Sequence, residues 1–189
     1  RSLFIIDNGA TLGHVDHPDL VENLHVAQLP SNLGVPASWN LGIKAFFKEE
    51  WVLVVGDDVT FPAGALAQFA EQADPSKIVL AHTWPHWCAF AYGMDVVDTA
   101  GLFDERFYPA YYEDTEYEWR CRNLGVPIEM SSIAVGHTNA STLNTPRRQF
   151  ALRKSLTDAS NGALFHDKQQ EPVTRDTPFS LFRWRNQAW

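Results

Sequence analysis

This chain of 189 residues has only two cysteines, no long apolar run and no excess of positive charge. Each of these absences argues against a class of protein. Cys88 and Cys121 are too few for a disulfide framework and lack the spacing of zinc ligands, so we expect two buried thiols. No apolar run approaches the roughly 20 residues that span a membrane, and we find no secretory signal. The net charge of −8 argues against general nucleic-acid binding. A cytoplasmic enzyme fits these limits.

Short apolar strands alternate with helical patterns along the chain, which is typical of an α/β domain with a mostly parallel sheet flanked by helices. We expect strands at 3–6, 24–29, 51–55, 78–81, 89–94 and 128–135. We expect helices that start at Pro36, Pro62, Asp95 and Glu113, and a last helix over 146–159 that leads into an extended tail. The chain becomes more polar and more basic after residue 139, so we divide it into a domain, 1–142, and a C-terminal appendage, 143–189.

The stretch WVLVVGDDVTFP predicts a strand over 51–55, buried on both faces, with Asp57 and Asp58 at its carboxyl end. Ligands of open α/β sheets bind beyond the carboxyl ends of the strands. Adjacent carboxylates there favour a cation such as Mg²⁺ or Mn²⁺, which in turn favours phosphates. A solvated Asp-Asp turn is the alternative interpretation.

The segment EDTEYEWRCRNLG predicts a helix that is acidic at its start and basic near its end. Glu116–Arg120 and Glu118–Arg122 have the i,i+4 spacing of helical ion pairs. Without further information, the acidic residues at the start are explained by their favourable interaction with the helix dipole at its N-terminus.

Several segments, in this order and spacing, resemble the GT-A-fold glycosyltransferases of family 2, especially rhamnosyltransferase-like and galactofuranosyltransferase-like members. They are FIIDNGA, NLGVPASWNLGIK, VLVVGDDVTFPAGAL, AFAYGMDVVDTAGLFDERFYPAYYEDTEYEWRCRNLG and VGHTNAS. The resemblance covers about residues 3–142, and the run GLFDERF…EDTEYEWR is its most specific part. It implies a Rossmann-like GT-A sheet and transfer of a hexosyl or deoxyhexosyl group, with inversion, from a nucleotide-diphosphate sugar to a hydroxyl of a glycan, protein or lipid-linked acceptor.

The resemblance also implies catalytic roles. Asp114 matches the general base that takes the proton of the acceptor hydroxyl. We expect the helix dipole to favour its ionised form. Glu113 and Glu116 match acidic positions of the same motif and would hold hydroxyls of acceptor or donor.

A divalent ion on the diphosphate is implied as well. Asp58 takes the metal-ligand position of a D-x-D-like motif whose first position is Gly56 here, so Asp57 would contact ribose or sugar instead. His137 matches a second metal ligand of some members, and a neutral imidazole suits Mn²⁺.

The remaining matched residues concern the donor and the acceptor. Asp7 matches the carboxylate that binds the nucleotide base, with an Asx turn as its structural alternative. Asn32 and Asn40 match the segment that lines the donor pocket. Trp84 and Trp87 lie where members meet sugar or acceptor, although burial in the core explains a tryptophan equally well.

The usual first strand and helix of the family have no counterpart before Leu3. A second chain or the C-terminal tail could complete the sheet and the nucleotide pocket, a preceding segment could have been removed, or the chain could no longer bind nucleotide. A catalytically inactive sugar-binding module is therefore one alternative function. A metal-dependent nucleotidyltransferase is another, but it leaves the GLFDE…ED run unexplained.

Overall fold

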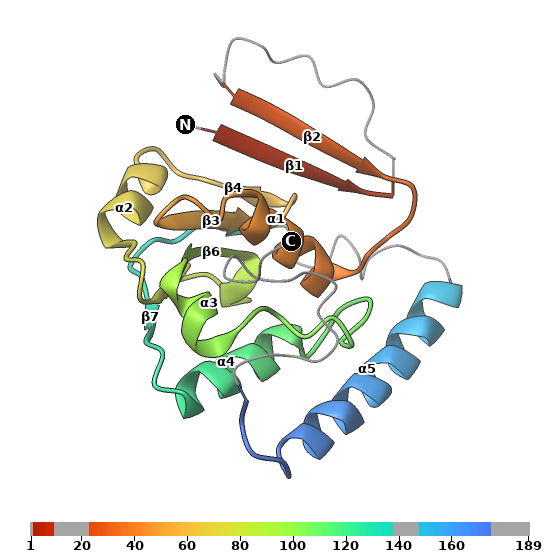
Figure 1. The fold of residues 1–189 in the computed structure, drawn as a ribbon. Helices are drawn as coiled ribbons and strands as arrows, with labels where there is room; N and C mark the ends of the chain where they lie inside the picture. Colours follow the sequence, from red (N-terminus) through yellow and green to blue (C-terminus); the bar gives the residue numbers. More distant parts are fainter. Residues whose placement is uncertain (1, 10–22, 138–147, 175–189) are drawn as a thin grey trace.

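The computed structural model describes residues 2–9, 23–137 and 148–174. These residues form a mixed α/β fold with five α-helices (Figure 1). The strands are β1 (Ser2–Asn8), β2 (Asn23–Leu29), β3 (Trp51–Val55), β4 (Val59–Thr60), β5 (Ile78–Leu80), β6 (Ala89–Gly93), β7 (Ile128–Met130) and β8 (Gly136–His137). The helices are α1 (Val35–Ala45), α2 (Ala65–Gln72), α3 (Asp95–Ala100), α4 (Glu113–Asn123) and α5 (Arg148–Lys168), with a short 3-10 turn, η1 (His86–Cys88), before β6.

The central sheet has the strand order β3-β6-β5-β7. β6 is antiparallel to both β3 and β5, whereas β5 and β7 are parallel. β3, β5 and β7 therefore share one direction, and their carboxyl ends meet at one edge of the sheet. β1 and β2 form a separate parallel pair, and β4 and β8 form a third, antiparallel pair.

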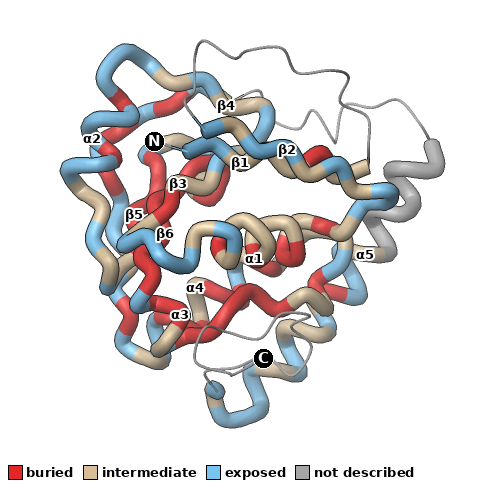
Figure 2. The backbone as a smooth tube through the Cα atoms, turned by 45° about the horizontal axis from the view of Figure 1, so that its top comes forward, coloured by how far each residue is buried: buried red, intermediate tan, exposed pale blue. Residues whose placement is uncertain are grey.

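Successive side chains of the central strands point to opposite faces of the sheet, so the core has two layers. The large residues Phe90 and Tyr92 of β6 pack on one face against α1, α3 and α4, whereas Ala89 and Ala91 face α2 and its buried Phe69. Buried residues accordingly follow the central sheet and the helices that cover it (Figure 2). Both cysteines are buried and free, as expected from the sequence.

The structure changes several expected boundaries. Pro62 does not begin a helix. The chain after Asp58 first forms β4, and α2 begins at Ala65, three residues after Pro62. The strand expected over 128–135 ends at Met130. Helix α5 extends to Lys168 instead of ending near residue 159, and the expected tail beyond residue 174 lies outside the described residues.

The expectation that β3 is buried on both faces is wrong in part. Val52 is buried, but Val55 is 39% exposed. Among the described strands β3 pairs only with β6, so it is an edge strand of the central sheet.

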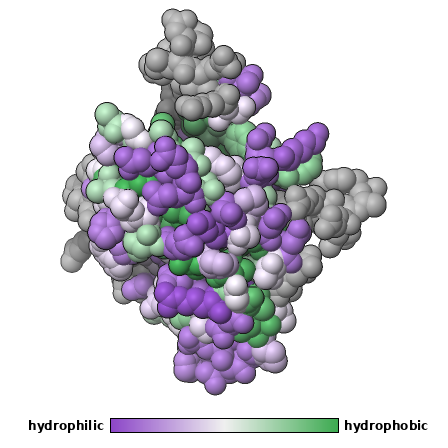
Figure 3. All heavy atoms as spheres, turned by 90° about the vertical axis from the view of Figure 1, so that its left-hand side faces the viewer, coloured by the Kyte–Doolittle hydropathy of each residue, from purple (hydrophilic) through white to green (hydrophobic). Residues whose placement is uncertain are grey.

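The surface over the side of the molecule that carries α2 and β7 is mostly hydrophilic, with smaller hydrophobic areas between the polar side chains (Figure 3). In the part of the chain that the structure describes, no helix is both long enough and apolar enough to cross a membrane.

Candidate functional site

The chain turns sharply after β3, and this turn carries the two adjacent aspartates. Gly56 N donates a hydrogen bond to Cys88 O at 2.8 Å, which holds the turn against the start of β6. Val59 N then donates to Gly56 O at 3.3 Å and begins β4. Asp57 is exposed, whereas Asp58 is partly buried.

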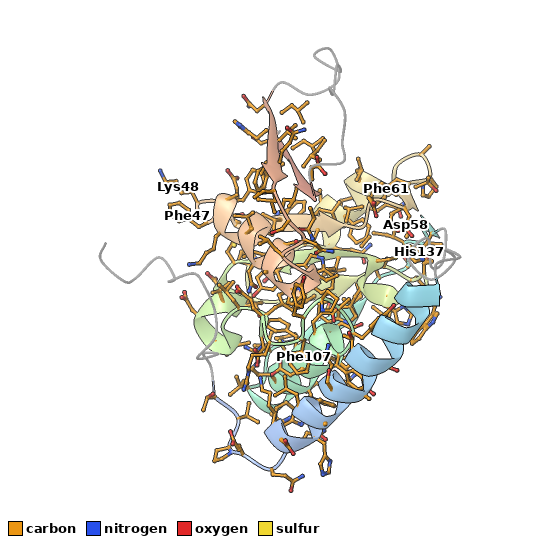
Figure 4. All side chains as sticks on the ribbon, turned by 90° about the vertical axis from the view of Figure 1, so that its right-hand side faces the viewer. Phe47, Lys48, Asp58, Phe61, Phe107 and His137 are labelled. Atoms are coloured by element: carbon orange, nitrogen blue, oxygen red, sulfur yellow. The ribbon has the colours of Figure 1, made fainter. Side chains whose placement is uncertain are left out.

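β4 pairs with β8, and this pairing brings Asp58 to His137. Val59 lies opposite His137 in the register. Nε2 of His137 lies 3.1 Å from Oδ1 of Asp58, and the two side chains are only 11% and 19% exposed (Figure 4). The tertiary structure therefore places these two residues side by side.

The donor set of this pair fits a small divalent cation. Neighbouring ligands of an octahedral ion, each about 2.1 Å from it, lie about 3 Å apart. The 3.1 Å between Nε2 and Oδ1 matches that spacing. Nδ1, on the other side of the His137 ring, is buried and has no hydrogen-bond partner among the described residues. Within the described ranges no cluster of three or more His, Cys, Asp or Glu side chains forms, so phosphate or water oxygens would have to complete the coordination.

The loop between β5 and β6 lies at the same edge of the sheet. His82 N donates to Ile133 O at 2.8 Å, and the Thr83 hydroxyl exchanges hydrogen bonds with the backbone of Val135, just before β8. Trp84 is 74% exposed and free to meet a ligand. Trp87 instead packs among the rings of Trp39 and Phe90 in the core, so the structure favours the buried interpretation for this residue.

A second acidic group lies at the start of α4. Glu113 is 7% exposed, and its Oε2 finds no hydrogen-bond partner within the described part of the chain. Burial and the neighbouring Asp114 charge raise the pKa of Glu113 to about 8, although backbone N–H groups of Glu113 and Tyr111 act in the opposite direction. Burial also raises the pKa of Asp114, against hydrogen bonds from the N–H and hydroxyl of Thr115.

The expected effect of the helix dipole on Asp114 is thus not the dominant one. Loss of hydration outweighs the hydrogen bonds at the helix start, and the pKa rises instead of falling. A carboxylate with a raised pKa is a stronger base while it remains ionised, which suits proton removal.

Glu116 does not occupy the position that a ligand-binding residue needs. Its side chain is fully buried, and it accepts hydrogen bonds from Arg120 and from Lys168 of α5. Lys168 also contacts the buried Asp104 at 2.7 Å. Burial alone would raise the pKa of Asp104, but hydrogen bonds from Arg106 and Lys168 hold it at about 2. Glu116 therefore belongs to an internal ion network.

Asn40 also lies away from any ligand position. It is fully buried, and its amide bonds to the backbone of Phe103 and to the Glu105 carboxylate. Its buried amide thus ties α1 to the loop that precedes α4, which does not fit the expected donor-pocket role.

Asn32 follows β2 and lies against Asn8, the neighbour of Asp7 at the carboxyl end of β1. Asp7 is 6% exposed near the end of β1. The next residue, Asn8, donates to Oδ1 of the exposed Asn32 at 2.9 Å and accepts a hydrogen bond from Leu33 N at 2.7 Å. Sequence reasoning did not single out Asn8, although its place in the Asp7-Asn8-Gly9 turn signal was visible.

The structure thus brings Asp58 to His137 and Glu113 beside Asp114, and it places Asn32 against Asn8, the residue after Asp7. Among the described residues no hydrogen bond or ion pair joins Asp58 or His137 to Glu113 or Asp114. Sequence reasoning also missed Asn161 of α5, whose amide contacts the backbone just before Glu113. Nothing in the local sequence around Asn161 marks that contact.

No protein-family model matches this chain, and no curated protein matches it either.

Proposed function

We propose that this chain is a metal-dependent, inverting glycosyltransferase with a GT-A fold, related to family 2. The observation that carries the proposal is the contact between Asp58 and His137. The family motifs assign both residues to one metal site, and they meet at 3.1 Å although they come from distant parts of the chain. The mixed sheet, with three strands in one direction and β6 reversed, is compatible with a GT-A arrangement.

The proposed reaction needs a group that accepts a proton from the acceptor hydroxyl. Asp114 takes this role, because it is ionisable, partly exposed and held at the first turn of a helix. Glu113, with its raised pKa of about 8, carries a proton at neutral pH and can donate a hydrogen bond to a hydroxyl of donor or acceptor.

The reaction also needs positive charge near the departing nucleotide diphosphate. Asp58 and His137 would hold Mn²⁺ or Mg²⁺, and the ion supplies charge neutralisation for the diphosphate when it is bound. Asp7 and Asn32 would bind the nucleotide end of the donor, Asp57 its ribose or sugar, and the exposed Trp84 a sugar face of donor or acceptor.

Activity assays test this proposal directly. The purified chain is incubated with Mn²⁺, a panel of nucleotide-diphosphate sugars and simple glycan or lipid-linked acceptors, and release of nucleotide diphosphate is measured. We expect release with the wild type and a loss of at least about 100-fold with Asp114→Asn, which keeps shape but cannot accept the proton. Sugar binding without turnover in either protein would favour the binding module instead. Pyrophosphate release from a nucleoside triphosphate would favour the nucleotidyltransferase.

Calorimetry with Mn²⁺ tests the metal site independently of turnover. His137→Ala should weaken Mn²⁺ binding by at least about tenfold, because a ligand is lost. His82→Ala is the matched control, since His82 is exposed and lies in the neighbouring loop. Equal affinities in the wild type and both variants would remove His137 from the proposed site.

A further inference from the structure

Two consecutive tyrosines just before α4 adopt a backbone conformation that side chains normally avoid. Tyr111 has φ 76° and Tyr112 has φ 71°, both in the left-handed region. Such residues cost about 1–2 kcal/mol each and persist only where the surrounding structure holds them. Because Glu113 follows directly, this bend determines where the acidic pair Glu113–Asp114 lies.

The bend is held from outside by helix α5. Nδ2 of Asn161 donates hydrogen bonds to the carbonyl oxygens of Ala110 and Tyr111, each at 2.9 Å. Asn161 is only 3% exposed, although both neighbouring positions of α5 are more accessible. A buried asparagine with both amide hydrogens on two successive carbonyls fixes the orientation of those peptide groups.

The next residue of α5 brings the helix against the second tyrosine. A Cβ atom built on Gly162 would lie 3.2 Å from the hydroxyl oxygen of Tyr112 and 3.3 Å from its Cζ. One turn further, the ring of Phe165 packs on Tyr112 and on Trp119 of α4. Contacts from α5 therefore cover the bend at both its carbonyls and its second side chain, and Figure 1 shows α5 running along this side of the molecule, opposite α2.

We propose that Asn161 is a positioning residue for the acidic pair: through the carbonyls of Ala110 and Tyr111 it holds the left-handed bend that places Glu113 in its buried position and leaves Asp114 partly exposed. The catalytic role of Glu113 and Asp114 in this proposal rests on the proposed function. The proposal also makes α5 part of the site, and not a separate appendage beyond residue 142.

Several ionisable groups act on the acidic pair or beside it. Asp114 acts electrostatically on Glu113, and Glu118 acts on Asp114. Tyr111 of the bend interacts electrostatically with Glu113 and with Asp158 of α5. The backbone N–H groups of Glu113 and Tyr111 act on the Glu113 carboxylate. A change in the bend therefore alters both the burial of Glu113 and two of its hydrogen bonds.

The experiment measures the titration of Glu113 by carbon-13 NMR of labelled glutamate side chains in the full chain, with Glu113→Gln to assign the signal. We compare the wild type with Asn161→Ala, and with Ser160→Ala as the matched control, since Ser160 is exposed on the same turn and its hydroxyl donates to Thr157 O within α5. Asn161→Ala should lower the pKa of Glu113 by about one unit or more, because the freed bend lets the carboxyl reach water. Ser160→Ala should leave it unchanged.

Gly162→Ala gives a second, milder perturbation. Alanine favours the helix, so α5 should not melt at lower temperature, but its methyl group would press on the hydroxyl end of the Tyr112 ring, which must shift by a few tenths of an ångström. We expect a lower Glu113 pKa in this variant too, and a circular dichroism spectrum equal to that of the wild type. If Asn161→Ala does not fold, Asn161→Ser takes its place, because a single hydroxyl hydrogen can serve at most one of the two carbonyls.

An unchanged Glu113 pKa in every folded variant overturns the proposal. The titration requires no turnover, so its outcome is separate from that of the proposed function. Where transfer activity is present, Asn161→Ala should lower kcat and leave the Mn²⁺ affinity at Asp58 and His137 unchanged. A loss of Mn²⁺ affinity together with kcat would instead indicate general destabilisation and would count against a positioning role.

Discussion

The side-chain amide of Asn40 pairs with the backbone of Phe103 in both directions. Phe103 N donates to Oδ1 of Asn40 at 2.9 Å, and Nδ2 of Asn40 donates to Phe103 O at 2.9 Å. Both residues are fully buried, so the amide takes the place that a neighbouring strand would have beside Phe103. This contact joins α1 to the loop that runs toward Glu113 and Asp114.

Asn40→Ala should therefore destabilise the fold. It leaves the N–H and carbonyl of Phe103 buried without partners, and each such group costs about 1–3 kcal/mol. We expect the free energy of unfolding in urea to fall by about 2–4 kcal/mol. Gln68→Ala, at an exposed position of α2, should change it by less than about 0.5 kcal/mol. Equal values for both variants would contradict this role for Asn40.

Glu113 should make the fold less stable as the pH rises. Its pKa is about 8 in the folded chain and near 4.5 in the unfolded chain, so the folded state binds more protons between these values. Stability therefore falls as pH increases from about 4.5 to about 8, by up to a few kcal/mol. Glu113→Gln removes this titration and should flatten the pH profile of urea unfolding in that window. A profile that remains unchanged in Glu113→Gln would show that Glu113 titrates normally.

Two ion pairs of α4 have the same spacing but differ in burial, and they should differ in energy. Arg120 and Glu116 are 2% and 0% exposed, and Arg120 also donates to the carbonyls of Ala100 and Leu102. Arg122 and Glu118 are 71% and 30% exposed. Arg120→Met should cost about 3–5 kcal/mol, because it leaves buried acceptors unpaired, whereas Arg122→Met should cost at most about 1 kcal/mol. Urea unfolding of the two variants measures the difference, and similar costs would refute the effect of burial.

Two glycines should respond to alanine with opposite signs. A Cβ atom on Gly93 would lie 2.3 Å from the carbonyl oxygens of Asp74 and Pro75, both of them backbone atoms that cannot move aside cheaply. A Cβ atom on Gly42 of α1 would make an ordinary contact with Ile6 at 3.8 Å. Gly93→Ala should lower the stability by about 2 kcal/mol or more. Gly42→Ala should raise it by up to about 1 kcal/mol, because alanine favours helices. Thermal unfolding distinguishes these outcomes, and a shift of the same sign in both would contradict the prediction.

Local patterns in the sequence determined the elements and the chemistry of individual positions. Trp51–Val55 is a strand, Glu113 begins an acidic helix, and Glu116–Arg120 forms an ion pair, as predicted. These features depend on residues within a few positions of one another, so the sequence shows them directly. The family resemblance implied that Asp58 and His137 lie together, the tertiary structure shows them in contact, and their binding of a metal is our proposal.

Only the tertiary structure decided which candidate residues are buried in the fold and which remain accessible. Asn40, Glu116 and Trp87 were expected at the site but lie in buried networks, and Asn161 was not expected there but holds the bend before Glu113. The same is true of β4, whose two residues become a strand only because β8 lies beside them. Burial and hydrogen bonding between distant segments depend on how the whole chain packs, and no local pattern of residues carries that information.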